Sequence, residues 1–399
     1  MASRARNLDR PIAVLAAMAF ITQLGVSVML PLLPLYAQSL GATPFILSLL
    51  VGGFAIALAG GQLASGFLAE RFASRRLVVT GIGTYAAANV AIAWSSTAVQ
   101  LIAFRALAGL GSGINQVAER LYVTQVADRA RLAFSNGILS AAGSAGSVLG
   151  PTFGGVLAAI GDLRVPFIVV GITSLSATVA GWFLPAPGPR DGAMPRPAET
   201  GTALRANGSA LRVLVVLFLV QLAFQATFGA FITTYAPFAS ERLDWSTAEI
   251  GLVFSLFGLG SILLGPWLAR QADRRGRRLF GIIGCALIFP FAIAYVAEAP
   301  RLILYPVSVL TGAGVTTIEA AWFALLAEAT DGGRQGRAFG TIVALSSLGI
   351  VIGSTVAAQL WERSGDVGLG LLVASAAVAI AGLLLLAHPA DRGAAPSPA

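Results

Sequence analysis

The sequence predicts an all-α membrane protein with twelve transmembrane helices in two pseudo-symmetric six-helix halves. Three observations carry this prediction. The 399-residue chain is 56% hydrophobic and only 11% charged, whereas soluble domains carry about 25% charged residues. Its apolar runs are too long and too numerous for a soluble fold. A basic loop occurs twice, and its acidic residues Glu70 and Asp273 lie 203 positions apart, which indicates a duplicated half.

Twelve apolar runs each reach the ~20 residues that span a hydrocarbon core. Their approximate bounds are 11–36, 45–69, 77–97, 99–125, 132–160, 164–186, 211–238, 247–270, 279–298, 300–328, 336–361 and 366–388. The first run is too long for a cleaved signal peptide, so we expect it to be the first spanning helix. A Pro- and Gly-rich stretch follows the sixth run and predicts a linker. We therefore expect an N-terminal half at 1–186, a cytoplasmic linker at 187–209 and a C-terminal half at 210–399.

The basic residues are distributed unevenly along the chain. The net charge is +8, and all 26 basic residues are arginines. Most fall in the tails, alternate loops and the linker, and four fall on the opposite side: Arg164, Arg242, Arg301 and Arg363. This asymmetry follows the positive-inside rule. It argues against nucleic-acid binding and predicts a multi-pass protein of the inner (plasma) membrane with both termini in the cytoplasm.

The single Cys and single His leave no metal cluster and no catalytic triad. We therefore expect no metal, no enzymatic activity and no bound cofactor. The constant offset between the halves gives an internal control. A residue present in both halves is expected to serve the scaffold, whereas a polar residue present in one half is a better functional candidate.

The duplicated loop resembles the G-x-L-a-D-r-x-G-r-R pattern of the major facilitator superfamily, and the resemblance extends over essentially the whole chain. The first copy matches at Gly66, Glu70, Arg71 and Arg75, with Glu70 in place of Asp; the second keeps Asp273, Arg274, Gly276, Arg277 and Arg278. The resemblance implies a secondary transporter that works by alternating access. We expect Glu70 to meet the start of the eleventh span and Asp273 the start of the fifth, because helix N-termini favour anions. The arginines can hold lipid phosphates or neighbouring carboxylates. The alternative is a plain positive-inside loop.

The fifth span carries a run of small residues that resembles the signature of the drug/proton antiporter families: Gly137, Gly146, Gly150, Pro151, Gly154 and Gly155. Glycines four residues apart leave one face without side chains, so a partner helix can approach closely. Pro151 removes a backbone hydrogen bond and should bend the helix. The eleventh span keeps Gly349 and Gly353 but not the proline. The alternative is ordinary packing of small residues.

Three charged residues within predicted spans are candidates for proton coupling: Arg105, Glu119 and Glu319. A charge inside a span costs about 2.5–3.5 kcal/mol on insertion scales, so it should face the interior. The resemblance supports Arg105, which begins a match to the family's R-x-x-q-G motif. The alternatives are that Arg105 reaches the headgroups and that Glu119 pairs with Arg120. Glu319 has no basic neighbour in sequence, and its counterpart in the first half is Gln116.

In the family the first, fourth, seventh and tenth spans line the central path. Polar and aromatic residues on these spans are therefore candidates for substrate binding: Gln23, Asn115, Gln116, Gln221, Gln225, Phe228, Tyr235 and Trp322. Each could equally form an interhelical hydrogen bond or pack in a core.

We expect proton-coupled efflux of small lipophilic or drug-like compounds by a monomer that contacts membrane lipids and draws on the proton gradient. The first span has no acidic residue, although several multidrug members of the family carry one there, and this counts against the expectation. The alternative within the same fold is uptake of a sugar or organic acid. A transport-inactive sensor is a further alternative, disfavoured by the short termini.

Overall fold

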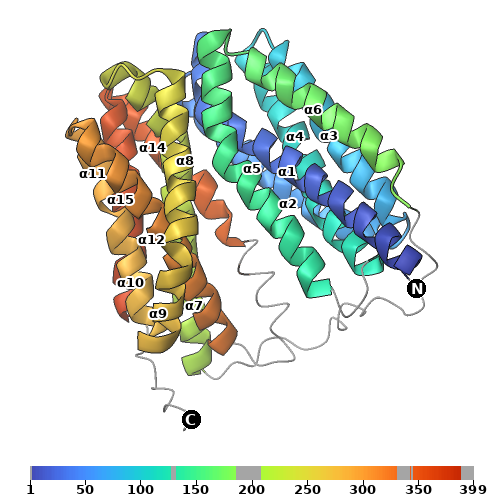
Figure 1. The fold of residues 1–399 in the computed structure, drawn as a ribbon. Coiled ribbons are helices and arrows are strands. Elements are labelled where there is room, and N and C mark those ends of the chain that lie inside the picture. Colours follow the sequence, from blue (N-terminus) through green and yellow to red (C-terminus); the bar gives the residue numbers. More distant parts are fainter. Residues whose placement is uncertain (1, 127–131, 186–207, 330–341, 343–344, 388–399) are drawn as a thin grey trace. The chain divides into compact units, whose positions relative to one another are not determined.

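The first half of the chain folds into six long helices, which Figure 1 shows in blue to green. The computed structural model describes residues 2–126, 132–185, 208–329, 342 and 345–387, and these are helical almost throughout. The helices of this half are α1 (Ala2–Ser39), α2 (Pro44–Leu68), α3 (Ser74–Ala93), α4 (Ala98–Val126), α5 (Leu132–Ile160) and α6 (Val165–Trp182). They follow the first six predicted spans in order.

The second half repeats this series with two breaks. Its helices are α7 (Gly208–Arg242), α8 (Thr247–Leu263), α9 (Gly265–Arg275), α10 (Arg277–Ile288), α11 (Pro290–Val296), α12 (Arg301–Ala329), α14 (Leu348–Ser364) and α15 (Val367–Ala387). The predicted span 247–270 is in fact α8 and α9, which are bent by 46°. The predicted span 279–298 is α10 and α11. Pro266 and Pro290 each stand at the start of the helix after a break, where the missing N–H of proline is tolerated.

Nine helices of the described residues are long and apolar enough to cross a membrane, or ten if α8 and α9 form one span. Two predicted spans fall outside this set. The span at 99–125 is α4, which carries Arg105, Glu119 and Arg120. The span at 336–361 begins outside the described residues and continues as α14, 17 residues long. The chain is therefore a multi-pass helical membrane protein.

The chain divides into two compact units. One unit comprises Met1–Gly41 and Gly53–Arg205, and the other comprises Ala42–Gly52 and Ala206–Ala399. The start of α2 thus belongs to the second unit. Each unit has its own apolar core, around Tyr122 in the first and around Phe224 in the second. The only cysteine of the chain, Cys285, is buried in α10 within the second core.

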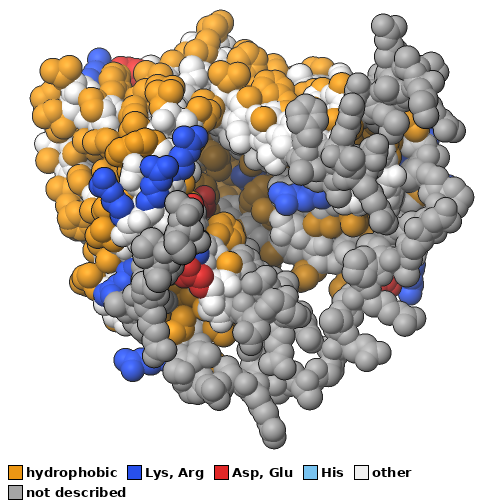
Figure 2. Space-filling model, turned by 60° about the horizontal axis from the view of Figure 1, so that its bottom comes forward, with side chains coloured by type: hydrophobic (Ala, Val, Ile, Leu, Met, Phe, Trp, Pro, Cys, Tyr) orange, Lys and Arg blue, Asp and Glu red, His pale blue; other side chains and the backbone are white. Residues whose placement is uncertain are grey.

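Large apolar side chains also lie on the outside of the units. Ile160, Phe183 and Leu302 are each at least 80% exposed. Figure 2 shows hydrophobic side chains, in orange, over much of the visible surface, with arginines in blue among them. Contiguous exposed apolar surface of this kind suits contact with lipid.

The same close helix contacts recur in both units at the 203-residue offset. A Cβ added at Gly111 would lie 2.8 Å from the carbonyl oxygen of Gly81, and one at Gly314 would lie 2.7 Å from that of Gly284. These contacts join α4 to α3 and α12 to α10. An unusual backbone conformation also recurs at this offset, since Gly41 and Asp244 both have a positive φ, at 77° and 51°. The duplication seen in sequence therefore extends to backbone packing.

Candidate transport site and its supporting loops

Arg105 lies deep in the first unit, with no carboxylate partner among the described residues. Its side chain belongs to α4 and is 4% exposed. Nη1 donates to Sδ of Met29 in α1 over 3.2 Å, and the guanidinium carbon lies 3.8 Å from the ring centroid of Phe54 in α2. Such stacking of a cation over an aromatic face partly replaces lost hydration. Arg105 is therefore enclosed between helices rather than extended to the headgroups.

Glu119, on the same helix, is also buried and is held by an amide. Its side chain is 7% exposed, and Asn115 Nδ2 donates to its Oε1 over 2.9 Å. Arg120 is exposed and forms no ion pair with it. The expected alternative, a pair of Glu119 with Arg120, is therefore not present. Arg105 and Glu119 are separated by fourteen positions, or about 21 Å along a helix.

Glu319 of α12 differs from Glu119 because its side chain is exposed. Its counterpart Gln116 is partly buried and forms hydrogen bonds within the first unit. Gln62 of α2 donates to Gln116 Oε1 over 3.2 Å, and Gln116 Nε2 donates to Ser112 Oγ over 3.3 Å. At equivalent positions, the first half thus has an amide that forms hydrogen bonds, and the second half has an exposed carboxylate.

Two of the predicted substrate contacts form interhelical hydrogen bonds, the alternative that the sequence left open for each of them. Trp322 is 1% exposed, and its indole N–H donates to the carbonyl oxygen of Leu217 over 2.8 Å, joining α12 to α7. Gln23 donates to Ser147 Oγ over 3.2 Å, joining α1 to α5. The identity of these long-range partners could not be read from the sequence, which left open whether each residue lines the path or joins two helices.

The other predicted contacts on α7 lie in different surroundings. Phe228 is exposed, Gln225 is partly buried and Gln221 is buried. Tyr235 is fully buried in an aromatic cluster that was not predicted from the sequence. The members of this cluster besides Tyr235 are Phe231, Phe254, Phe257, Phe291 and Tyr295, with ring centroids between 4.3 and 6.1 Å apart. The spacing of Phe231 and Tyr235, four residues apart on one helix face, was the available signal.

The small-residue face of α5 packs directly on the backbone of α1. A Cβ added at Gly150 would lie 2.7 Å from the carbonyl oxygen of Leu24, and one at Gly154 would lie 2.7 Å from Val28 Cγ1. Gly146 makes a similar approach, Pro151 and Gly155 are buried, and Gly137 faces open space. In the second unit, Gly349 and Gly353 of α14 approach carbonyl oxygens of α7. The close contact is therefore inside each half and common to both.

The duplicated loop holds the third helix of each half against its fourth, by different chemistry. In the first unit, Ser74 Oγ donates to Gln125 Oε1 over 2.5 Å. At the equivalent positions of the second unit, Arg277 pairs with Glu328. Arg277 also pairs with Asp273 over 3.4 Å. The first half thus uses a neutral hydrogen bond where the second uses a charged network.

The next arginine of each loop binds the end of the last helix in its own half. Arg75 donates to the carbonyl oxygen of Trp182 at the end of α6. Arg278 donates to the carbonyl oxygens of Leu385 and Leu386 at the end of α15. Carbonyls at a helix C-terminus lack intrahelical partners and interact favourably with cations. This capping role was not predicted.

The remaining loop residues are mostly open to solvent. Gly66, Glu70, Arg71 and Arg274 are exposed, and Gly276 has φ 115° between α9 and α10, which suits glycine. The predicted contacts of Glu70 and Asp273 involve the starts of the eleventh and fifth spans. Residues 127–131 and 330–341 lie outside the described residues, so these two contacts stay predictions.

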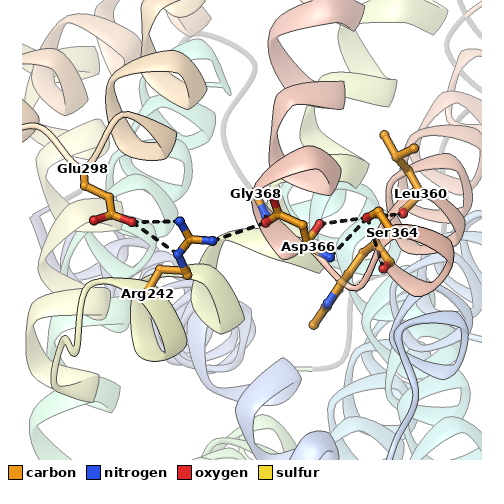
Figure 3. Close-up of polar contacts among 7 residues, drawn as sticks. Arg242, Glu298, Leu360, Ser364, Asp366 and Gly368 are labelled. Carbon is orange, nitrogen blue, oxygen red and sulfur yellow. Dashed lines mark hydrogen bonds and ion pairs between the residues drawn. The ribbon is translucent and has the colours of Figure 1, made fainter.

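Two arginines at the other end of the second unit are paired with acids. Arg242 lies between Glu298, 3.0 Å away, and Asp366, 3.6 Å away (Figure 3). Asp366 also accepts the backbone N–H of Gly368 over 2.8 Å. Arg301 pairs with Glu249 over 2.7 Å. Ion pairs thus occur at this end of the unit as well as at the loop end.

Comparison with known proteins assigns the family. The sequence profile of the Major Facilitator Superfamily matches residues 15–246 and 217–399. The chain belongs to the major facilitator superfamily. It is therefore a transporter of that type rather than an enzyme, with the fold expected from the loop motif.

Several named members of the superfamily are similar to this chain. The class C tetracycline resistance protein of Escherichia coli is 25% identical over 82% of both chains. A homolog of the multi-drug resistance efflux pump PmrA from Lactococcus lactis is 26% identical, over 87% of this chain and 88% of its own. An uncharacterized transporter of Methanocaldococcus jannaschii is 28% identical over 173 residues, and this match spans 45% of its length.

Solved structures agree at the level of the fold. A point mutant of the nucleoside transporter NupG gives a TM-score of 0.77 at 11% identity, and the match covers 95% of this chain and 98% of its own. A D-xylose–proton symporter gives 0.72 at 17% identity, over 94% and 95% of the two chains. These two proteins carry different substrates, so the similarity supports only the fold.

Proposed function

We propose that this transporter exports small lipophilic or drug-like organic compounds in exchange for protons. The observation that carries the proposal is the pair of membrane carboxylates, Glu119 and Glu319, neither of which is ion-paired within the described residues. A carboxylate with no fixed cation can take up a proton without breaking an ion pair. The near full-length similarity to named tetracycline and multi-drug efflux proteins supports the direction of transport.

The proposed cycle uses Glu319 as the proton carrier, because its side chain is exposed and has no ion-pair partner among the described residues. The carboxylate would be protonated from one side and would release the proton when the path opens to the other. Glu119 would have the lesser part, since Asn115 holds it in a buried position. Arg105, a buried cation, would favour the ionised form of a carboxylate that approaches it during the cycle.

The substrate would meet the accessible part of the predicted set, which includes Phe228 and Gln225 of α7. The few charged side chains on these helices suit lipophilic cargo.

The proposed membrane and orientation follow from the uneven distribution of arginines along the sequence. The transporter would lie in the inner (plasma) membrane as a monomer, with both termini in the cytoplasm.

The test is substrate-driven proton release in proteoliposomes by wild type, Glu319→Gln and the matched variant Glu119→Gln. Glutamine keeps the size of the side chain but cannot release a proton. We expect Glu319→Gln to lose proton release and the pH dependence of transport, while exchange of substrate for substrate continues. Glu119→Gln should show a milder defect.

Wild-type proton release by Glu319→Gln would remove it as the carrier. Drug accumulation in an efflux-deficient host tests the direction separately. Expression of the wild type should lower accumulation, and collapse of the proton gradient should abolish the effect. Raised uptake of a sugar or organic acid, with no effect on drugs, would instead favour the uptake alternative.

A further inference from the structure

The short helix α9 has an unusual exposed face. It runs from Gly265 to Arg275 at a 46° bend from α8 and turns Leu268 and Ala272 inward. Trp267 is 59% exposed. Arg270 and Arg274, three and seven residues further along, are also exposed and share its side of the helix. Arg275 is exposed beside them. We call these four residues the α9 basic face.

The charges of the α9 basic face are not balanced by nearby acids. Within the described part of the chain, Arg270, Arg274 and Arg275 form no ion pair or hydrogen bond through their side chains. The one acidic residue of α9, Asp273, is already paired with Arg277. At the other end of the same unit, Arg242 and Arg301 both have carboxylate partners. Three arginines without an ion-pair partner among the described residues therefore lie on this one short helix.

Two simpler explanations cover only part of this arrangement. Cations near a helix C-terminus are favoured by the helix dipole, which accounts for Arg274 and Arg275 but not for Arg270 in the middle of α9. The internal duplication does not account for it either. The positions equivalent to Arg270 and Arg275 in the first half are Phe67 and Phe72, and both are exposed. The second half thus has arginines where the first half has exposed aromatic rings.

The place of α9 in the unit fits the boundary between hydrocarbon and water. The residues just before the bend, Ile262 and Leu263, are exposed and apolar. The residue just after α9 leads into α10, where Arg278 binds the end of α15. A tryptophan between an apolar segment and a charged one is typical of the membrane interface. Arginine binds phosphate oxygens with two parallel hydrogen bonds.

We propose that the α9 basic face binds the phosphate headgroups of anionic phospholipids, with Trp267 at the level of the interface. The bend at Leu264 tilts α9 by 46° from α8, and the exposed Arg270, Arg274 and Arg275 would extend to the headgroups. This inference concerns the lipid partner and does not depend on the transported substrate or on proton coupling.

The test measures binding of phosphatidylglycerol and phosphatidylcholine to the purified full-length transporter by native mass spectrometry. Wild type should prefer phosphatidylglycerol, and high salt should weaken that preference. Each basic residue near an anionic surface contributes about fivefold in binding. R270Q/R274Q should therefore lower phosphatidylglycerol affinity by about 25-fold, whereas R270K/R274K should largely keep it.

The matched control removes two arginines at the opposite end, R242Q/R301Q. It should leave phosphatidylglycerol binding unchanged, because both side chains are already paired with acids. Thermal unfolding in phosphatidylcholine nanodiscs would show that each variant is folded.

If R270Q/R274Q does not fold, two measurements on wild type still test the proposal. These are the salt dependence of phosphatidylglycerol binding and the competition by inorganic phosphate. Equal binding of the two lipids by wild type, or phosphatidylglycerol binding that R270Q/R274Q retains, would overturn the proposal. Displacement by inorganic phosphate at equal concentration would show an anion site without lipid specificity, and would overturn it as well.

Discussion

Arg278 donates through Nε to the carbonyl oxygen of Leu385, 2.9 Å away, and so ties the start of α10 to the end of α15. The same contact occurs 203 residues earlier, between Arg75 and Trp182. In each half, the loop that leads into the third helix thus caps the C-terminus of the sixth. The basic loop therefore has a structural role inside its own half, besides any role it has in gating.

Replacement of Arg75 by Gln should destabilise the first half. The substitution removes a charged donor from the Trp182 carbonyl at the end of α6, and such a hydrogen bond at the surface contributes about 1 kcal/mol. Thermal unfolding in detergent would measure the loss. Arg76→Gln is the control, because Arg76 is exposed and its side chain has no partner among the described residues. Equal unfolding temperatures for the two variants would contradict the capping role.

Replacement of Gly150 by Leu should impair folding of the first half before it affects transport. Even a Cβ here would lie 2.7 Å from the carbonyl oxygen of Leu24 and 2.9 Å from Ser27 Cβ. α1 and α5 would have to separate. Gly137→Leu is the control, since Gly137 faces open space. The yield of monodisperse protein distinguishes the two variants, and a normal yield of Gly150→Leu would count against this packing.

Replacement of Glu328 by Gln should weaken the second half slightly and remove its sensitivity to salt at this contact. The Arg277 and Glu328 side chains are partly exposed, at 31% and 55%, so the pair is worth at most about 1 kcal/mol. R277S/E328Q would copy the Ser74–Gln125 contact of the first half and should recover part of the loss. A double-mutant cycle from chemical unfolding gives the coupling energy. Zero coupling would mean that the ion pair does not hold α10 to α12.

The 203-residue offset made much of this fold predictable. The order of the spans and the close contacts of Gly146 and Gly349 follow from apolar run length and small-residue spacing. The breaks at Leu264 and Phe289 were not predicted, although Pro266 and Pro290 marked them. The length of an apolar run takes no account of the backbone N–H that a proline lacks. Applied to the loops, the offset would also have paired Ser74 and Gln125 with Arg277 and Glu328.

The candidate site was less predictable than the fold. Which residue meets a given side chain depends on helix rotation within a unit, and hydropathy does not fix that rotation. Trp322 reaches a backbone carbonyl 105 positions away, and Gln23 reaches Ser147. Both residues looked like path residues because they are polar or aromatic on the expected helices. Glu119 next to an exposed Arg120 shows the same limit, since its partner proved to be Asn115 one turn away.

The burial of Cys285 has a practical consequence. It is the only thiol in the chain, and it lies in α10 at 4% exposure, packed in the core of the second unit. Water-soluble maleimide or nitroxide reagents should react with it slowly in the folded protein. A cysteine introduced at an exposed site such as Trp267 or Phe183 would then be the dominant reactive sulfur. Spin labels and fluorophores could thus be attached one at a time to the otherwise native sequence.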